Sequence, residues 1–294
     1  MQKIIDQTEV TLNNGRPMAV PGLGTADMLG WRAKGPEFSQ LLEKALDLGY
    51  RHIDTASFYG NEEGIGTAIK NSPVKREDIM LVSKVWNSEQ GYEETQAAFR
   101  RSLERLGTDY LDLYLIHWPK PDQYLDTWRA MEKLYAEGLI KAIGLSNFHK
   151  KHIEDILEHG TVLPAANQLE IHPYLQQQEL VDFCRQCDIQ VVGWSPLGTG
   201  NWSSVAAEDK PLNDAKLQEL AQKQNKTVAQ IILRWNLQRG IVPIPKSNSL
   251  QRIRENLDIF SFSLSEQDMQ EIAQLDTNNR LSRQNPEDTS TWVG

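Results

Sequence analysis

Short apolar runs rich in β-branched residues alternate along the chain with longer segments whose apolar positions recur every three to four residues. The first pattern predicts buried strands and the second predicts amphipathic helices. Glu37–Leu48 and Glu93–Leu106 are typical of the predicted helices. The eight predicted strands are Val20–Thr25, His52–Thr55, Ile79–Lys84, Leu111–His117, Lys141–Ser146, Ala165–Glu170, Gln190–Ser195 and Ile241–Pro245.

Strict alternation of eight strands with helices favours an α/β fold of the (β/α)8 TIM-barrel type over an open doubly wound sheet, which has about six strands and a glycine-rich first turn. Glycine lies just ahead of several predicted strands, where it would end the preceding helix. These positions are Gly49, Gly107, Gly138 and Gly240. We therefore predict that residues 1–294 form a single barrel domain.

Three segments depart from this alternation. Thr8–Leu12 and Pro17–Val20 flank an Asn-Asn-Gly turn and predict an N-terminal β-hairpin that plugs the bottom of the barrel. Asp214–Gln224 and Thr227–Gln238 predict two helices between the last two strands, the first of them an extra helix near the C-terminus. The polar tail from Thr277 predicts an irregular segment that folds over the barrel or frays.

The chain carries 31 basic and 40 acidic side chains, a formal net charge of −9, which argues against nucleic acid or an anionic membrane as the main partner. Its 39% hydrophobic and 24% charged content is ordinary for a globular protein. No leader pattern or membrane-length apolar stretch is present, so we expect a cytoplasmic protein. Cys184 and Cys187 fall within a helical pattern, so packing is favoured there over redox or metal chemistry.

Candidate chemistry gathers where barrel enzymes carry it, at the C-terminal ends of the strands. Asp54 ends the second strand, Tyr59 follows in its loop, Lys84 ends the third strand and His117 ends the fourth. Each alone has an ordinary structural explanation, but Lys84 lies in an apolar run and needs a partner, for which Asp54 is the nearest candidate. An ammonium beside the tyrosine would lower the phenol pKa from about 10 and make it a proton donor near neutrality.

Seven segments in chain order make the sequence resemble the aldo-keto reductases over almost its whole length. They are GLGTA at Gly22, HIDTASFYGNEEGIG at His52, VSKVWN at Val82, DLYLIHWP at Asp112, GLSNF at Gly144, NQLEIHPY at Asn167 and IPKSNSLQRIRENL at Ile244. The resemblance implies a metal-free reductase of small aldehydes or ketones with the tetrad Asp54, Tyr59, Lys84 and His117. It implies that Tyr59 protonates the developing alkoxide, Lys84 tunes Tyr59, and His117 polarises the carbonyl.

Gly22-Leu-Gly24 does not continue into the glycine motif of a Rossmann fold. The resemblance implies instead that the cofactor is NADPH and that it binds in extended form. Ser146, Asn147 and Gln168 would hold the nicotinamide carboxamide, and Trp194 would stack on the ring. The remaining implied cofactor residues are Thr25, then Ser195, Leu197 and Gly198 at the pyrophosphate, Lys246, Ser247 and Arg252 at the 2′-phosphate, and Glu255 and Asn256 near the adenine.

The chain departs from the commoner family pattern around the expected substrate pocket. Ala26 replaces a frequent aromatic residue, Trp194 replaces a frequent tyrosine, and the loop Pro119–Leu125 is short. These differences imply an open pocket, as in bacterial reductases of small aldehydes and keto-acid sugars. Its walls would be Trp86 and Trp118, with Trp202 and Trp292 as further candidates.

Two other functions are compatible with parts of the sequence. A non-catalytic, cofactor-binding member of the same fold would not need the intact tetrad. A metal-dependent barrel hydrolase would use His52, Asp54, His117 and His172, but it would also want a His-x-His on the first strand, which is missing. We instead expect His52 to pack inside the barrel, Glu170 and His172 to hold a loop, and His149, His152 and His159 to be solvated. A closed barrel leaves no unpaired edge, so we expect a monomer.

Overall fold

The computed structural model describes residues 5–198, 206, 209–282 and 284–291. Its strands are β1 (Glu9–Thr11), β2 (Pro17–Ala19), β3 (Leu23–Gly24), β4 (His52–Asp54), β5 (Met80–Val85), β6 (Leu113–Ile116), β7 (Ile143–Ser146), β8 (Ala166–Glu170), β9 (Gln190–Trp194) and β10 (Val242–Pro243). Its α-helices are α1 (Pro36–Asp47), α2 (Glu62–Asn71), α3 (Tyr92–Leu106), α4 (Tyr124–Ala136), α5 (Lys150–His159), α6 (Gln178–Gln186), α7 (Ala215–Gln224), α8 (Val228–Gln238), α9 (Leu250–Glu255) and α10 (Glu266–Ala273).

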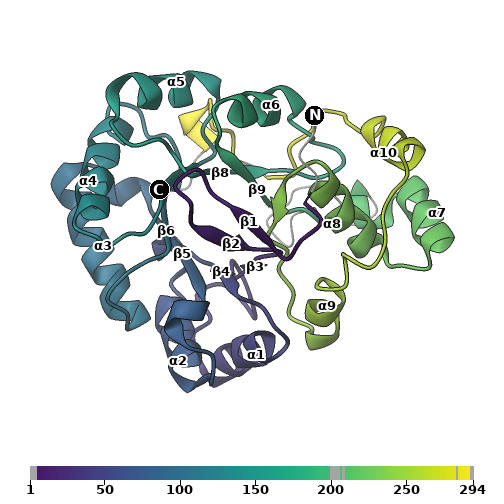
Figure 1. Ribbon diagram of the computed structural model, residues 1–294, viewed down its shortest axis with the longest axis horizontal. Coiled ribbons are helices and arrows are strands. Elements are labelled where there is room, and N and C mark those ends of the chain that lie inside the picture. Colours follow the sequence, from purple (N-terminus) through teal and green to yellow (C-terminus); the bar gives the residue numbers. More distant parts are fainter. Residues whose placement is uncertain (1–4, 199–205, 207–208, 283, 292–294) are drawn as a thin grey trace.

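Strands β3 to β10 form one parallel sheet in chain order, and helices surround it (Figure 1). The sheet closes on itself, because the Gly22 and Gly24 amides donate to the carbonyls of Pro243 and Pro245, both over 3.1 Å. The predicted (β/α)8 barrel is therefore confirmed. β10 is shorter than expected, since the prolines at 243 and 245 have no N–H to donate to a ladder.

The N-terminal hairpin is also confirmed. Strands β1 and β2 pair antiparallel, with Val10 opposite Met18, and they lie across the centre of the barrel in the view of Figure 1. Buried side chains of the hairpin pack with interior residues of the strands, such as Leu115. His52 is buried at this end, with its Nδ1 3.0 Å from the carbonyl oxygen of Ala19, as expected for an interior packing residue.

Helix ends follow the signals in the sequence. Asp214 and Thr227 cap the N-termini of α7 and α8, so both helices predicted between the last two strands are present. Gly107 ends α3 in the left-handed conformation at φ 62°, as its position predicted. Cys184 lies buried in α6 and Cys187 directly after it, and burial raises the pKa of both thiols, that of Cys184 to about 12. Low-pKa thiolates of the redox type are thus absent from this helix.

Candidate active site

A cavity of about 620 Å³ opens at the C-terminal ends of the barrel strands. Its walls come from the ends of β3 to β10, the loops that follow them and helix α9. Every residue predicted for the tetrad and the cofactor lines this cavity, except Lys84, and so do the predicted substrate walls Trp86 and Trp118. The lining residues that the sequence did not single out include Asp27, Phe58, Lys210, Ser282 and Gln284.

Lys84 lies behind the cavity wall, on β5, beside Asp54 at the end of the neighbouring strand β4. Its Nζ donates to Asp54 Oδ1 over 2.6 Å and to the Thr55 carbonyl over 2.8 Å. The side chains are 0% and 3% exposed, so the partner predicted for this lysine is the one it has. Burial lowers the pKa of Lys84, and the charge of Asp54 opposes that effect. Gln168 on β8 completes the group by donating to Asp54 Oδ2 over 2.7 Å.

Tyr59 ends a short 3-10 turn, Ser57–Tyr59, and its ring centre lies 5.2 Å from Lys84 Nζ. The expected lowering of its pKa is wrong for this site. Burial, together with the nearby charge of Asp54, raises the pKa of Tyr59 well above its usual value. A neighbouring ammonium favours the phenolate, but the loss of solvent disfavours it, and here the loss of solvent has the larger effect. The phenol is therefore fully protonated at neutral pH.

His117 is buried at the end of the fourth barrel strand, with its ring centre 5.7 Å from that of Tyr59. Burial, and then the charge of Lys84, lowers the pKa of His117 well below its usual value. Its Nδ1 is buried without a hydrogen-bond partner in the part of the chain that the structure describes. The ring is thus a neutral imidazole beside the phenol.

Asn147 also lines the cavity and has the left-handed backbone conformation, at φ 62°. Its Nδ2 donates to the His117 carbonyl over 3.0 Å, and its Oδ1 accepts from the indole Nε1 of Trp194 over 3.0 Å. Its amide donates to the Gln168 carbonyl over 2.8 Å. Three of the four residues predicted at the nicotinamide, Asn147, Gln168 and Trp194, are in this way bonded to one another and to the tetrad. The fourth, Ser146, accepts from Asn147 Nδ2 over 3.1 Å.

Two cations, Lys246 and Arg252, line the same cavity. Burial, and then the neighbouring charge of Arg252, lowers the pKa of Lys246, while Asp27 opposes the shift. Arg252 donates from Nε to Ser247 Oγ over 3.2 Å. Among the described residues, no carboxylate oxygen lies within 4.0 Å of either cationic group. Two neighbouring cations without an anion fit a phosphate group of a ligand.

Aromatic rings form the wall next to the phenol. Trp86, predicted here, stacks on Phe58 with ring centres 3.7 Å apart, and Trp31 contacts the edge of Phe58 at 5.2 Å. Sequence reasoning missed Phe58 and Trp31, although Phe58 directly precedes Tyr59. Trp118 also lines the cavity. Trp202 and Trp292 lie outside the described residues.

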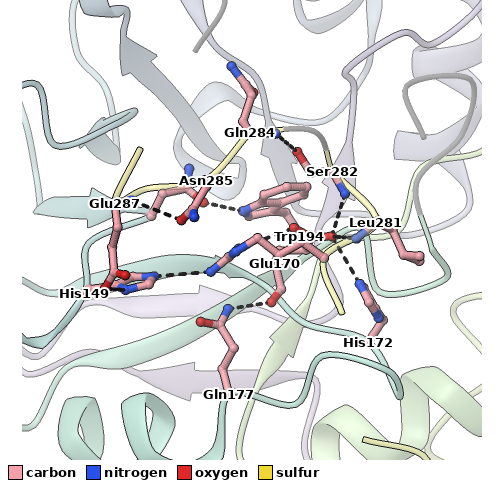
Figure 2. Close-up of polar contacts among 12 residues, drawn as sticks. His149, Glu170, His172, Gln177, Trp194, Leu281, Ser282, Gln284, Asn285 and Glu287 are labelled. Atoms are coloured by element: carbon pink, nitrogen blue, oxygen red, sulfur yellow. Dashed lines mark hydrogen bonds and ion pairs between the residues drawn. The ribbon is translucent and has the colours of Figure 1, made fainter. Parts of the chain in front are cut away.

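The polar tail was predicted either to fold over the barrel or to fray, and it folds back onto the barrel. Arg280 is 3.4 Å from the carboxylate of Glu170 and bonds His149 over 3.2 Å, and His149 also bonds Glu287 over 2.8 Å (Figure 2). Glu170 and His172 hold the loop after β8, as expected: His172 pairs with Leu175, and the Glu170 carbonyl accepts from Gln177 Nε2 over 2.7 Å. The Glu170 carboxylate also binds the tail. The expectation that His149 and His152 are solvated is wrong: both are half-buried, and burial lowers the pKa of each.

The described residues contain no group of three or more His, Cys, Asp or Glu side chains placed to hold a metal ion. His52 lies at the hairpin end of the barrel, so the set proposed for a metal hydrolase is not brought together. Within the described ranges, no helix has the length and apolarity needed to span a membrane.

Fold and site together define a barrel oxidoreductase, and the chain belongs to the aldo/keto reductase family, whose model matches residues 22–277. It is 50% identical to the glyoxal reductase of Bacillus subtilis over 92% of this chain and 94% of that protein. The crystal structure of an aldo-keto reductase from a deep-sea metagenome library is 43% identical, with a TM-score of 0.88 over 95% of this chain and 99% of that one. A Bombyx mori aldo-keto reductase in complex with NADP is 36% identical, with a TM-score of 0.86 over 97% and 96% of the two chains.

Proposed function

We propose that the protein reduces small aldehydes or ketones to alcohols with NADPH, and that Tyr59 donates the proton. The observation that carries the proposal is one cavity lined both by the tyrosine–histidine pair and by two cations, Lys246 and Arg252, that form no ion pair with another described residue. A nicotinamide cofactor would use both features, because it carries phosphates as well as a reactive ring. The best-supported alternative, a non-catalytic cofactor-binding protein, would not need the buried Lys84–Asp54 pair beneath the phenol.

The cofactor, when bound, supplies the hydride to the carbonyl carbon. The protein's own part is to bind the carbonyl oxygen and protonate it. A neutral His117 donates a hydrogen bond to that oxygen without competing for the proton, because burial keeps its pKa low. Tyr59 is protonated in the resting site, and an alkoxide is a much stronger base than a phenolate, so proton transfer from Tyr59 Oη is favourable even with its raised pKa.

The Lys84 ammonium, 5.2 Å from the ring of Tyr59, stabilises the phenolate that this transfer leaves. Asp54 keeps the ammonium charged and in place through its 2.6 Å contact. The Lys84–Asp54 pair is shielded from solvent, which strengthens the interaction between its charges. In this proposal Asp54 and Lys84 act on Tyr59, Tyr59 and His117 touch the carbonyl oxygen, and Trp86 and Trp118 form the walls of the substrate pocket.

The proposed roles of the cofactor residues follow those that the resemblance implies. Lys246, Ser247 and Arg252 would bind the 2′-phosphate, and Trp194 would stack on the nicotinamide beside Asn147 and Gln168. The other contributors are Thr25, Ser146, Ser195, Leu197, Gly198, Glu255 and Asn256, all of which line the cavity. Asp27 and Glu255 lie near the cations and would moderate the preference for NADPH over NADH.

The test is oxidation of NADPH, followed by its absorbance, against a panel of aldehydes and ketones. An α-dicarbonyl belongs in the panel because the Bacillus subtilis relative is named a glyoxal reductase. Turnover of any panel member supports the proposal, and tight NADPH binding without turnover of any favours the non-catalytic alternative. We further infer that the chain forms a single domain and is a cytoplasmic monomer. Light scattering over a dilution series tests the monomeric state.

A further inference from the structure

The C-terminal segment is attached to the barrel through one buried carboxylate, that of Glu170 at the end of β8. Its Oε1 accepts from the amides of Leu281 and Ser282 over 2.8 and 3.0 Å and lies 3.1 Å from His172 Nε2. Arg280 approaches Oε2 to 3.4 Å. Figure 2 shows the contacts of Leu281, Ser282 and His172 converging on the carboxylate. The Glu170 side chain is 0% exposed, and a buried carboxylate needs such partners.

Most of the groups that satisfy Glu170 therefore belong to the tail. Two are backbone amides, which no side-chain substitution in the tail removes, and the third is the Arg280 guanidinium. Hydrogen bonds to an ionised acceptor are roughly twice as strong as neutral ones. The position of residues 280–282 is thus set by a charge on the barrel.

A second contact holds the same segment. Arg280 Nη2 lies 3.2 Å from His149 Nε2, and His149 Nδ1 lies 2.8 Å from Glu287 Oε1. Arginine can only donate, so His149 must accept at Nε2 and carry its proton on Nδ1, which donates to Glu287. The tail is fixed on both sides of the residues that reach the cavity.

The anchor lies next to the wall proposed for the cofactor. Glu170 is paired in register with Trp194 and is two residues after Gln168, so the Glu170 and Gln168 side chains share a face of β8. Leu281 packs beside Gly198, where an added Cβ would be 3.3 Å from Leu281 Cδ1. Directly after it along the tail, Ser282 and Gln284 line the cavity.

We propose that Glu170 is a positioning residue for cofactor binding. It fixes the tail as a strap beside Trp194, so that Ser282 and Gln284 close the cofactor side of the cavity. The inference rests on the proposed function, because it assigns that side of the cavity to NADPH. Without the carboxylate the strap detaches, and the cofactor loses one wall while the tetrad keeps its geometry.

The test compares Glu170→Ala with the parent, with Glu158→Gln on the exposed face of α5 as the control. We expect amide hydrogen exchange to become about tenfold faster in the peptide that contains Leu281 and Ser282, since charge-assisted bonds are lost. We expect the Kd for NADPH, measured by fluorescence, to rise about threefold or more, with kcat at saturating NADPH within about twofold. The exchange rate and the Kd of Glu170→Gln should lie between those of the parent and of Glu170→Ala, because an amide oxygen still accepts from the tail.

Arg280→Met gives an independent variant, because it removes a partner of the carboxylate from the tail and leaves the barrel intact. Like Glu170→Ala, it should speed amide hydrogen exchange in the tail and raise the Kd for NADPH. The inference would be overturned if amide exchange in the tail were unchanged, or if it became faster while the Kd stayed the same. Faster exchange in all barrel strands would also overturn it. Failure of the proposed function would instead appear in the parent protein, as absence of NADPH binding or of carbonyl reduction.

Discussion

Lys84 Nζ lies 2.6 Å from Asp54 Oδ1, and both side chains are buried. Because the two residues lie on adjacent strands, the sheet itself sets their distance. The same ammonium is 5.2 Å from the ring of Tyr59, which links a structural ion pair to the proposed proton donor. Removing half of this pair would leave a charge in a medium that cannot solvate it.

Lys84→Met should therefore lower both stability and activity. Loss of one partner from a buried pair typically costs about 3–5 kcal/mol. Urea unfolding of Lys84→Met, Asp54→Asn and the double variant measures the coupling. We expect the double variant to be less destabilised than the sum of the singles, because the second substitution removes the stranded charge. Strict additivity would show that the two groups do not stabilise each other.

Tyr59→Phe should reduce carbonyl reduction at least a hundredfold, in the range reported for loss of a general acid of about 10²–10⁴. The ring remains, so the contacts of Trp31 and His117 with it are kept, and the Kd for NADPH should change little. Tyr92→Phe, at an exposed tyrosine of α3, is the control. Steady-state turnover within tenfold of the parent would refute the role of Tyr59.

Buried histidines predict how stability responds to acid. Burial lowers the pKa of His117 and of His52, so the unfolded chain takes up protons below about pH 6.5 that the folded chain does not. Stability must then fall as the pH drops below about 6.5, by at most about 1.4 kcal/mol per pH unit for each such histidine.

His117→Asn removes one of these groups and should make the decline shallower. Denaturant unfolding between about pH 5 and pH 7 measures the slope. His159→Asn, at the exposed end of α5, is the matched control. A slope in His117→Asn equal to that of the parent would show that His117 is protonated in the folded protein.

The barrel could be predicted because its strands and helices leave local patterns, and because glycine and capping residues mark the helix ends. The gathering of Asp54, Tyr59, Lys84 and His117 could be predicted because parallel strands bring their C-terminal ends together. The pKa of Tyr59 could not, since it depends on how much solvent the folded site excludes. The attachment of the tail to Glu170 could not either, because it joins residues 111 positions apart through backbone amides that no sequence pattern marks.

Arg252 tests the choice of cofactor. A charge-assisted hydrogen bond to a phosphate contributes about 1.5–3 kcal/mol, less where solvent screens it, so Arg252→Ala should weaken NADPH binding about tenfold. NADH lacks the 2′-phosphate, and its Kd should change far less. Arg254→Ala is the matched control, since Arg254 is exposed on the same helix and does not line the cavity. The loss for NADPH should shrink as salt is raised, because screening weakens the interaction in the parent. Equal losses for NADPH and NADH would mean that Arg252, through its 3.2 Å bond to Ser247, supports the loop and not the phosphate.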